Sequence, residues 1–237
     1  MEDDSTPTLV KLTMAPNLYA RGDTVGQLFA IASLFPLTVV IALSTLVLFK
    51  RDLHTICLAL AVYANVALNH VLKRLLKVER PDDSTLAKGH IEASAVYGMP
   101  SNHAQFFAFT TVYACYFFAW RLRSGDRWRR TANSTLWWRV PSVLLIASLG
   151  FLSAASKFYS RDHSIEQLAG GAGVGALTGI AYVILVQFVL TPLFPYVQRW
   201  GCCRFLLIRD TTKIPNLLQF EYDSVMEETR PISNQRH

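Results

Sequence analysis

Long apolar segments dominate this chain of 237 residues, and they limit the folds that it can adopt more than any other feature. The first, from Gly26 to Phe49, contains no charged residue. At about 1.5 Å per residue, a helix of this length crosses a hydrocarbon core of about 30 Å. Four further apolar segments follow, at residues 53–72, 104–120, 140–156 and 168–194. The sequence therefore predicts an all-α, multi-pass transmembrane bundle with five spans.

The composition agrees with a membrane protein, since 51% of the residues are hydrophobic and only 17% are charged. The segments 104–120 and 140–156 are short for a span, so a buried helix of a soluble protein is the alternative for these two. Residues 1–25 are polar and lack the basic start and cleavage site of a signal peptide. We expect a polar N-terminal segment at 1–25, a membrane domain at 26–194 and a tail at 195–237 that folds back on the domain or the membrane surface.

The net charge of +6 comes from basic residues that flank the apolar segments, without the basic, aromatic stripe of a nucleic-acid-binding face. If the five spans alternate, the turn 50–52, the loop 121–139 and the tail share one side. The turn and the loop are rich in Lys and Arg, so the positive-inside rule predicts that this side is cytoplasmic. The N-terminus, the loop 73–103 and the turn 157–167 then lie together on the other, lumenal side.

Each of these lumenal connections except the first carries residues suited to phosphate. Lys73 ends the second span, and Arg80-Pro81 follows in the same loop. A planar guanidinium can bind two phosphate oxygens, while an ammonium acts as a mobile point charge. The alternative is that Lys73 and its basic neighbours only reach for the membrane interface.

A second cluster, Pro100-Ser101-Asn102-His103, directly precedes an uncharged apolar segment and so marks the start of a helix. Free backbone N–H groups and the positive end of the helix dipole favour an anion there, and the Ser101 hydroxyl adds a donor. A helix cap followed by an interfacial histidine is the alternative interpretation.

The third cluster lies between the last two spans. It contains Ser156-Lys157 and His163, and His163 again stands where a helix begins. A neutral imidazole at that place could attack phosphorus, provided that another group holds its second nitrogen. Gln167, one helical turn further on, and its neighbour Glu166 are the candidates for that orienting role. An ordinary charged loop is the alternative.

The three clusters resemble, in order and spacing, the signature of the type 2 phosphatidic acid phosphatase superfamily, which comprises metal-independent lipid phosphatases and vanadium haloperoxidases. Its pattern is Lys-x6-Arg-Pro, Pro-Ser-x-His and Ser-Arg-x5-His-x3-Asp. The chain carries Lys73-x6-Arg80-Pro81, Pro100-Ser101-Asn102-His103 and Ser156-Lys157-x5-His163-x3-Gln167. The resemblance covers about residues 26–194 and implies the helical bundle of that superfamily, with no metal or other cofactor.

The resemblance also implies roles for the matched residues. His163 would be the nucleophile, and His103 would protonate the leaving group. The residues implied to bind phosphate are Lys73, Arg80, Ser101, Asn102 and Lys157. Lys157 departs from the pattern because it replaces an arginine, and this weakens the grip on phosphate unless Arg161 reaches in. Gln167 replaces an aspartate, and it can orient the imidazole but cannot stabilise an imidazolium by charge, so that Glu166 could contribute.

Segments outside the signature resemble the dolichyldiphosphatase branch of the superfamily. They are Phe49-Lys50-Arg51-Asp52-Leu53-His54-Thr55-Ile56, Tyr97-Gly98-Met99-Pro100, Leu190-Thr191-Pro192-Leu193-Phe194-Pro195 and, in the tail, Leu207-Ile208-Arg209-Asp210-Thr211, Ile214-Pro215-Asn216 and Phe220-Glu221-Tyr222. This branch implies hydrolysis of dolichyl diphosphate to dolichyl phosphate and phosphate through a phosphohistidine. It also implies a lumenal site in the endoplasmic reticulum membrane and recycling of the lipid carrier for protein N-glycosylation.

Two other functions stay open on the sequence. One is a broader lipid phosphatase that acts on phosphatidate or isoprenyl diphosphates. The other is a catalytically impaired membrane protein that only binds lipid phosphate, which Lys157 favours. In either case the partners are a lipid phosphate and the bilayer rather than nucleic acid. Cys202-Cys203, just past the last span, suit S-palmitoylation, and unmodified cysteines are the alternative.

Overall fold

The computed structural model describes residues 9–11, 18–20, 22–81, 97–119, 132–212, 214 and 217–229. A short antiparallel hairpin of β1 (Leu9–Lys11) and β2 (Leu18–Ala20) comes first. The following elements are helices, which confirms the predicted all-α class. They are α1 (Thr24–Ala32), α2 (Phe35–Lys50), α3 (Leu53–Leu76), α5 (Asn102–Ala119), α6 (Ala132–Tyr159), α7 (Ile165–Leu185), the π-helical turn η4 (Val186–Leu190), α8 (Thr191–Val197), α9 (Gly201–Phe205) and α10 (Leu217–Glu228).

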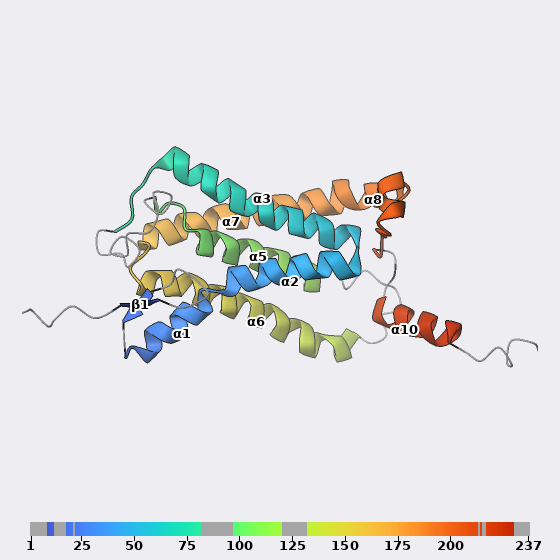
Figure 1. Ribbon diagram of the computed structural model, residues 1–237, viewed down its shortest axis with the longest axis horizontal. Coiled ribbons are helices and arrows are strands. Elements are labelled where there is room, and N and C mark those ends of the chain that lie inside the picture. The colour runs from blue at the N-terminus through green and yellow to red at the C-terminus, as the bar shows by residue number, and fades with distance from the viewer. Residues whose placement is uncertain are drawn as a thin grey trace, which may run out of the picture.

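The long helices α2, α3, α5, α6 and α7 form one bundle and run along its long axis (Figure 1). Each turns back on the one before it, so connections alternate between the two ends. At the left end in Figure 1 lie the end of α3, the start of α5, the end of α6 and the start of α7. These are the places of the three clusters, which the counting of spans had predicted to share one end.

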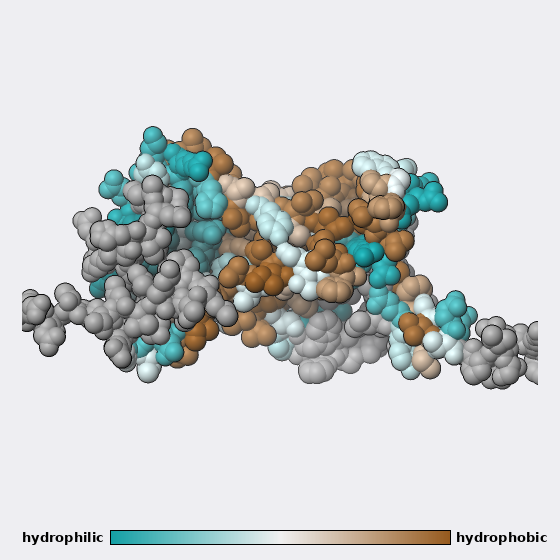
Figure 2. All heavy atoms as spheres, in the orientation of Figure 1, coloured by the Kyte–Doolittle hydropathy of each residue, from teal (hydrophilic) through white to brown (hydrophobic). Residues whose placement is uncertain are grey.

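The outside of the bundle is suited to lipid. Four segments are long and apolar enough to cross a membrane, namely Thr24–Lys50, Leu53–Leu76, Arg139–Tyr159 and Ile165–Val197. Many of their apolar side chains face outward; Leu48 and Leu177, for example, are 68% and 70% exposed. Figure 2 shows brown, hydrophobic residues across the middle of the visible face and teal, hydrophilic residues toward both ends. The chain is a multi-pass membrane protein.

Helix α5, which corresponds to the predicted span 104–120, is not among those four segments. It runs through the middle of the bundle and packs against both α6 and α7. Ala104, Phe106 and Phe109 are at most 2% exposed, and so is the amide side chain of Gln105. A helix covered by other helices need not match lipid, because its polar groups find partners inside the protein.

The first predicted span, 26–49, is broken into α1 and α2. Ser33 ends α1, and its hydroxyl donates to the carbonyl of Ala30. Pro36 stands in the first turn of α2, where its missing N–H costs nothing. The same proline could not continue α1, since it would leave a carbonyl of that helix without a donor. The break tilts α1 away from α2 and brings it against α6 (Figure 1).

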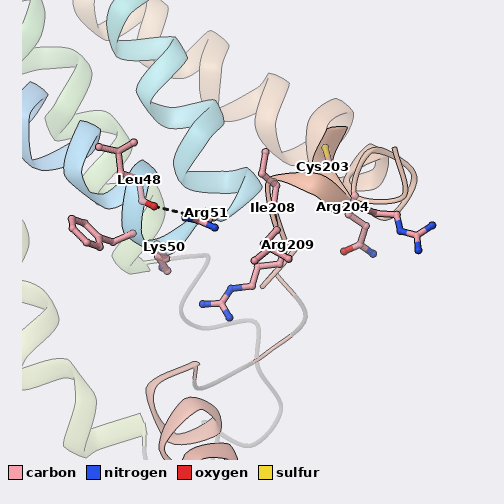
Figure 3. A pocket seen from close by; sticks show the side chains of 10 residues that line it. Leu48, Lys50, Arg51, Cys203, Arg204, Ile208 and Arg209 are labelled. Carbon is pink, nitrogen blue, oxygen red and sulfur yellow. Dashed lines mark hydrogen bonds between the residues drawn. The ribbon is translucent and has the colours of Figure 1, made fainter. Parts of the chain in front are cut away.

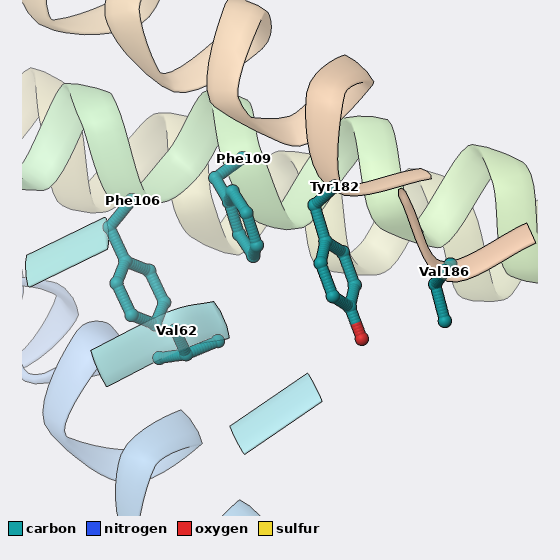
Figure 4. Close-up of a cluster of buried hydrophobic side chains, with 5 residues drawn as sticks. All are labelled: Val62, Phe106, Phe109, Tyr182 and Val186. Atoms are coloured by element: carbon teal, nitrogen blue, oxygen red, sulfur yellow. The ribbon is translucent and has the colours of Figure 1, made fainter. Parts of the chain in front are cut away.

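A small apolar core joins α3, α5 and α7. Its buried side chains are Val62, Phe106, Phe109, Tyr182 and Val186, which lie in one row along the bundle (Figure 4). Beside this core, Gly171, Gly175 and Gly179 of α7 face α5. A Cβ at Gly175 would overlap the backbone of Gln105, and one at Gly171 would lie 2.5 Å from the Ser101 carbonyl oxygen. The glycines therefore allow the two backbones to touch, as small residues do where membrane helices pack closely.

We expect Gly175→Ala to destabilise the bundle, because the added methyl group must push α5 away from α7. The free energy of unfolding should fall by about 1–3 kcal/mol or more, the usual cost of overpacking. Gly173→Ala is the matched control, since nothing lies within 4 Å of a Cβ at that position. It should leave stability unchanged or raise it by up to about 1 kcal/mol, as alanine favours a helix. Thermal unfolding in detergent measures both, and equal melting temperatures for the two variants would contradict the packing argument.

Candidate active site

Arg80 joins the first cluster to the third. Its Nη1 donates to the backbone carbonyl of Asp162 at 2.9 Å and lies 3.3 Å from Nε2 of His163. A guanidinium has only donors. Nε2 of His163 must therefore be the acceptor in this contact and carry a lone pair rather than a proton.

The other ring nitrogen of His163 points to Gln167. Nδ1 lies 3.1 Å from Gln167 Oε1, while Gln167 Nε2 donates to the backbone carbonyl of Glu79 at 2.8 Å. Because that carbonyl can only accept, the amide nitrogen must face Glu79 and the amide oxygen must face the ring. Nδ1 of His163 is then the protonated nitrogen and donates to Gln167. This tautomer leaves the Nε2 lone pair directed at Arg80.

His163 is held in its neutral form. The ring is 4% exposed, and burial followed by the positive charges of Arg80 and Lys73 lowers the pKa of His163 from 6.5 to about 3. The hydrogen bond to Gln167 and the charge of Asp162 oppose this shift in pKa only in part. An unprotonated imidazole among cations is what a nucleophile toward phosphate requires.

Lys157 lies on the same side of the site, buried at the end of α6. Its Nζ is 3.5 Å from Oδ2 of Asp162, and Ser160 donates to the same oxygen at 2.8 Å. Lys157 and Asp162 are 6% and 2% exposed. Arg161, by contrast, is exposed and sits at a left-handed backbone position with φ of 58°. The structure thus places Lys157, and not Arg161, inside the site.

The second cluster is fixed by its backbone. The N–H of Ser101 donates to the carbonyl of Gln167 at 3.1 Å, and Asn69 donates to the carbonyl of Pro100 at the same distance. The Ser101 hydroxyl is fully buried, and within the described ranges neither it nor Oδ1 of Asn102 has a hydrogen-bond partner. Asn102 begins α5 and Ser101 directly precedes it, at the helix start where backbone N–H groups lack helical acceptors. A phosphate at this helix start would meet donors from side chain and backbone together.

His103 is positioned by the break between α1 and α2. Its Nε2 lies 3.2 Å from the carbonyl of Ser33, which only accepts, so Nε2 carries a proton and Nδ1 is left for proton transfer. The ring is within electrostatic range of His163, Lys157 and Lys73. The N-terminal helix thus completes the site from a segment that the three clusters do not include.

Lys73 closes the set of predicted residues. It is half-buried at the end of α3 and interacts electrostatically with Arg80 and Lys157.

Of the two candidates for orienting His163, Gln167 is the one for which the described residues show a hydrogen bond to the ring. Glu166 is exposed in the first turn of α7, and the described residues record no hydrogen bond from it to His163. Position 166 faces outward where position 167 faces α5, so a contribution of Glu166 through its charge stays a prediction.

Sequence reasoning missed several residues that hold the site. They are Ser33, Asn69, Gln105 and Asp162. Asn69 lies in an otherwise apolar span, and a polar residue there usually faces the bundle interior. Ser164-x-x-Gln167 is also a capping-box pattern, which could have indicated that Gln167 turns back toward His163. No pattern marks Ser33, because its carbonyl is set by the break between two helices.

Chemically, the site offers a neutral imidazole lone pair, cations, a hydroxyl and a helix start, with a second imidazole nearby. Such groups bind a phosphoryl group and stabilise the charge that develops during its transfer. The described residues contain no group of three or more His, Cys, Asp or Glu side chains that could hold a metal ion.

Comparison with known proteins agrees with this arrangement. The model of the PAP2 superfamily matches residues 54–190. "Dolichyldiphosphatase 1" of Homo sapiens is 38% identical over 212 residues, which cover 90% of this chain and 86% of that protein. "Lipid phosphate phosphatase gamma" of Arabidopsis thaliana is 31% identical and covers 93% of each chain, and "Dolichyldiphosphatase" of Saccharomyces cerevisiae is 28% identical over 73% of this chain and 68% of its own. No solved structure matches significantly.

The matched region begins in α3, ends in η4 and includes all three clusters, and the full-length relatives extend the likeness into the tail. The resemblance seen in the sequence is thereby confirmed, and the chain belongs to the PAP2 superfamily.

Proposed function

We propose that this membrane phosphatase hydrolyses dolichyl diphosphate to dolichyl phosphate and inorganic phosphate. Similarity over most of the chain to proteins named dolichyldiphosphatase supports the substrate. The observation that carries the reaction is the state of His163: a neutral ring whose Nε2 lone pair lies 3.3 Å from Arg80 and whose Nδ1 proton is held by Gln167.

In the first step, His163 Nε2 attacks the terminal phosphorus, and the bond from that phosphorus to the bridging oxygen breaks. Dolichyl phosphate leaves with the bond's electrons, and a proton from His103 reaches the bridging oxygen. Arg80, Lys73 and Lys157 stabilise the negative charge on the equatorial oxygens, helped by the Ser101 hydroxyl and the start of α5. The product on the enzyme is a phosphohistidine.

In the second step, water attacks this phosphohistidine. His103, now neutral, takes a proton from the water at Nδ1, and the bond between phosphorus and His163 Nε2 breaks. Inorganic phosphate leaves, and His163 returns to its neutral state. Burial and the nearby charge of Lys157 lower the pKa of His103, so the negative charge of the bound diphosphate is what favours its protonated form at the start of the cycle. His103 gives up one proton and regains one in each cycle, so it ends protonated as it began.

The setting suits a lipid diphosphate. The site lies at the ends of α3, α6 and α7, where a bilayer around the spans would place its headgroups (Figure 1). A polyprenyl chain can stay in the hydrocarbon while its diphosphate enters the site. By the positive-inside argument this face is lumenal, and the proposed location is the endoplasmic reticulum membrane. The proposed role is recycling of the lipid carrier for protein N-glycosylation.

Two observations favour other functions of the same site. The relative named lipid phosphate phosphatase gamma favours a broader activity on phosphatidate or isoprenyl diphosphates. Lys157, in place of an arginine, favours an impaired protein that binds lipid phosphate without turnover, since lysine lacks the bidentate fork. The substrate test below distinguishes both from the proposed reaction.

We expect His163→Ala to abolish phosphate release from dolichyl diphosphate, because no nucleophile is left. The rate of phosphate release should fall more than about 1,000-fold, because removing one member of a catalytic set causes a loss of this size. His70→Ala is the control: His70 is an exposed histidine of α3 and should leave the rate unchanged. The assay measures inorganic phosphate released by purified protein in detergent. Retained turnover in His163→Ala would show that His163 is not the nucleophile.

The substrate test compares phosphate release from dolichyl diphosphate, dolichyl phosphate and phosphatidate, each with and without EDTA. We expect release from dolichyl diphosphate alone and no effect of EDTA, because cations of the protein provide the charge stabilisation. Similar rates with phosphatidate would indicate the broader lipid phosphatase. No release from any substrate would indicate the impaired protein. Loss of activity with EDTA and its return with Mg²⁺ would refute the metal-independent mechanism.

The low pKa of His163 also predicts how stability depends on pH. The unfolded chain protonates this ring near pH 6.5, whereas the folded protein does so only near pH 3. Its contribution to stability is therefore complete above about pH 6.5 and is lost as the pH falls toward 3. The melting temperature should drop less between about pH 7.5 and 5 in His163→Asn than in the natural protein. An equal drop in both would contradict a neutral, buried ring.

A further inference from the structure

A pocket lies at the end of the bundle opposite to the three clusters, between the turn that joins α2 to α3 and the chain after α8 (Figure 3). Its volume is about 640 Å³, within the range of about 300–1,000 Å³ that ligand sites commonly have. Four basic residues line it, namely Lys50, Arg51, Arg204 and Arg209. None of them takes part in the phosphate site described above.

The two walls of this pocket are tied to each other by hydrogen bonds. Arg209 N donates to the carbonyl of Arg51 at 2.9 Å, and Leu53 N donates to the carbonyl of Arg209 at 3.1 Å. Asp52, 3% exposed, caps α3 through Thr55 and also accepts from both the N–H and the hydroxyl of Thr211. The tail is thus hydrogen-bonded to the turn, in agreement with the expectation that it folds back on the domain. These bonds hold the pocket open without a ligand.

Within the described residues, most of the positive charge in the pocket has no carboxylate partner. Arg209 pairs with Glu221 of α10 at 2.8 Å. In the part of the chain that the structure describes, the Arg51 side chain donates to the carbonyls of Leu48 and Leu206, which are uncharged. The described residues place no carboxylate within ion-pair distance of Lys50 or Arg204. The carboxylate of Asp52 accepts hydrogen bonds from Thr55 and Thr211 instead.

The rim of the pocket is apolar on the side of the bundle. Leu48 and Phe49, the last apolar residues of α2, are 68% and 83% exposed, and Leu207 of the tail is 68% exposed. Helix α2 ends at Lys50, so this rim lies where hydrocarbon gives way to headgroups. Cations at headgroup depth beside an apolar rim match the two halves of a phospholipid. Basic pockets at the ends of membrane helices bind acidic lipids in this way.

We propose that this pocket binds the headgroup of an anionic phospholipid, in the leaflet opposite to the one that the phosphate site faces. Lys50 and Arg51 would approach the headgroup from the end of α2, and Arg204 and Arg209 from the tail. The acyl chains would lie along Leu48 and Phe49. Such a lipid would bridge the turn and the tail.

The test titrates the purified full-length chain in detergent with dioctanoyl phosphatidylinositol and with dioctanoyl phosphatidylcholine, and counts bound lipids by native mass spectrometry. We expect one phosphatidylinositol to bind at least tenfold more tightly than phosphatidylcholine. Lys50→Gln and Arg204→Gln should each weaken its binding about fivefold, since one cation near the headgroup contributes about 1 kcal/mol. Phosphate release should stay at its basal rate in both variants.

Arg199→Gln is the matched control. Arg199 is an exposed arginine of the same chain segment that does not line the pocket, and its loss should change the affinity less than twofold. An equal effect of Arg199→Gln and Arg204→Gln would mean diffuse attraction and overturn the proposal. Equal binding of the two lipids by the natural protein would overturn it without any variant. Full displacement of phosphatidylinositol by millimolar inorganic phosphate would show a site for soluble anions instead.

Discussion

The geometry of the candidate active site depends on the hydrogen bonds of the Gln167 side-chain amide. Its oxygen accepts from His163 at 3.1 Å and from the N–H of Ser164 at 3.4 Å, and its nitrogen donates to the carbonyl of Glu79 at 2.8 Å. An aspartate at this position, as in the superfamily pattern, could accept from the ring but could not donate to Glu79. Compared with aspartate, glutamine therefore loses a negative charge that would stabilise the imidazolium, and it gains a hydrogen bond to the first cluster. Gly98 fits this use, since a Cβ there would lie 2.5 Å from the amide oxygen.

The second cluster depends on contact between helix backbones. Gly171 and Gly175 bring α7 against the start of α5, and the carbonyl of Gln167 receives the N–H of Ser101 from the same direction. Behind this contact, Gln105 is fully buried and bonds to Asn69 and Asn65, and Asn69 in turn holds the carbonyl of Pro100. Nδ2 of Asn65 and Oδ1 of Asn69 have no hydrogen-bond partner among the described residues, but the other amide atoms form one connected chain. Such a chain resists movement, because breaking a link leaves a further buried polar group without a partner. The hydroxyl of Ser101 is thereby held in place without a substrate.

The sequence was sufficient to predict which residues meet, and insufficient to predict how they are held. Counting spans placed Lys73, His103 and His163 at one end because helix direction alternates whatever the packing. The choice of Gln167 over Glu166 needed the rotation of α7 against α5, which glycines on one face determine. The carbonyl that holds His103 comes from Ser33, and its position depends on the angle between α1 and α2. A backbone atom at a helix break leaves no signature in residue types.

Lys157 shows why a departure from the family pattern need not remove function. Three cations lie close together here, Lys157 buried and Lys73 and Arg80 half-buried, which is unfavourable unless charges or hydrogen bonds compensate. The carboxylate of Asp162 lies 3.5 Å from Lys157 Nζ, also acts electrostatically on Arg80, and accepts from Ser160 at 2.8 Å. The ammonium can therefore turn to a phosphate oxygen while the carboxylate keeps a donor. An arginine could bind Asp162 through two parallel hydrogen bonds, and it would have to break both of them to reach the same phosphate oxygen. In the proposed mechanism the lysine loses bidentate grip on phosphate but is more easily released from its resting partner, and Arg80 retains the guanidinium that lies beside the nucleophile.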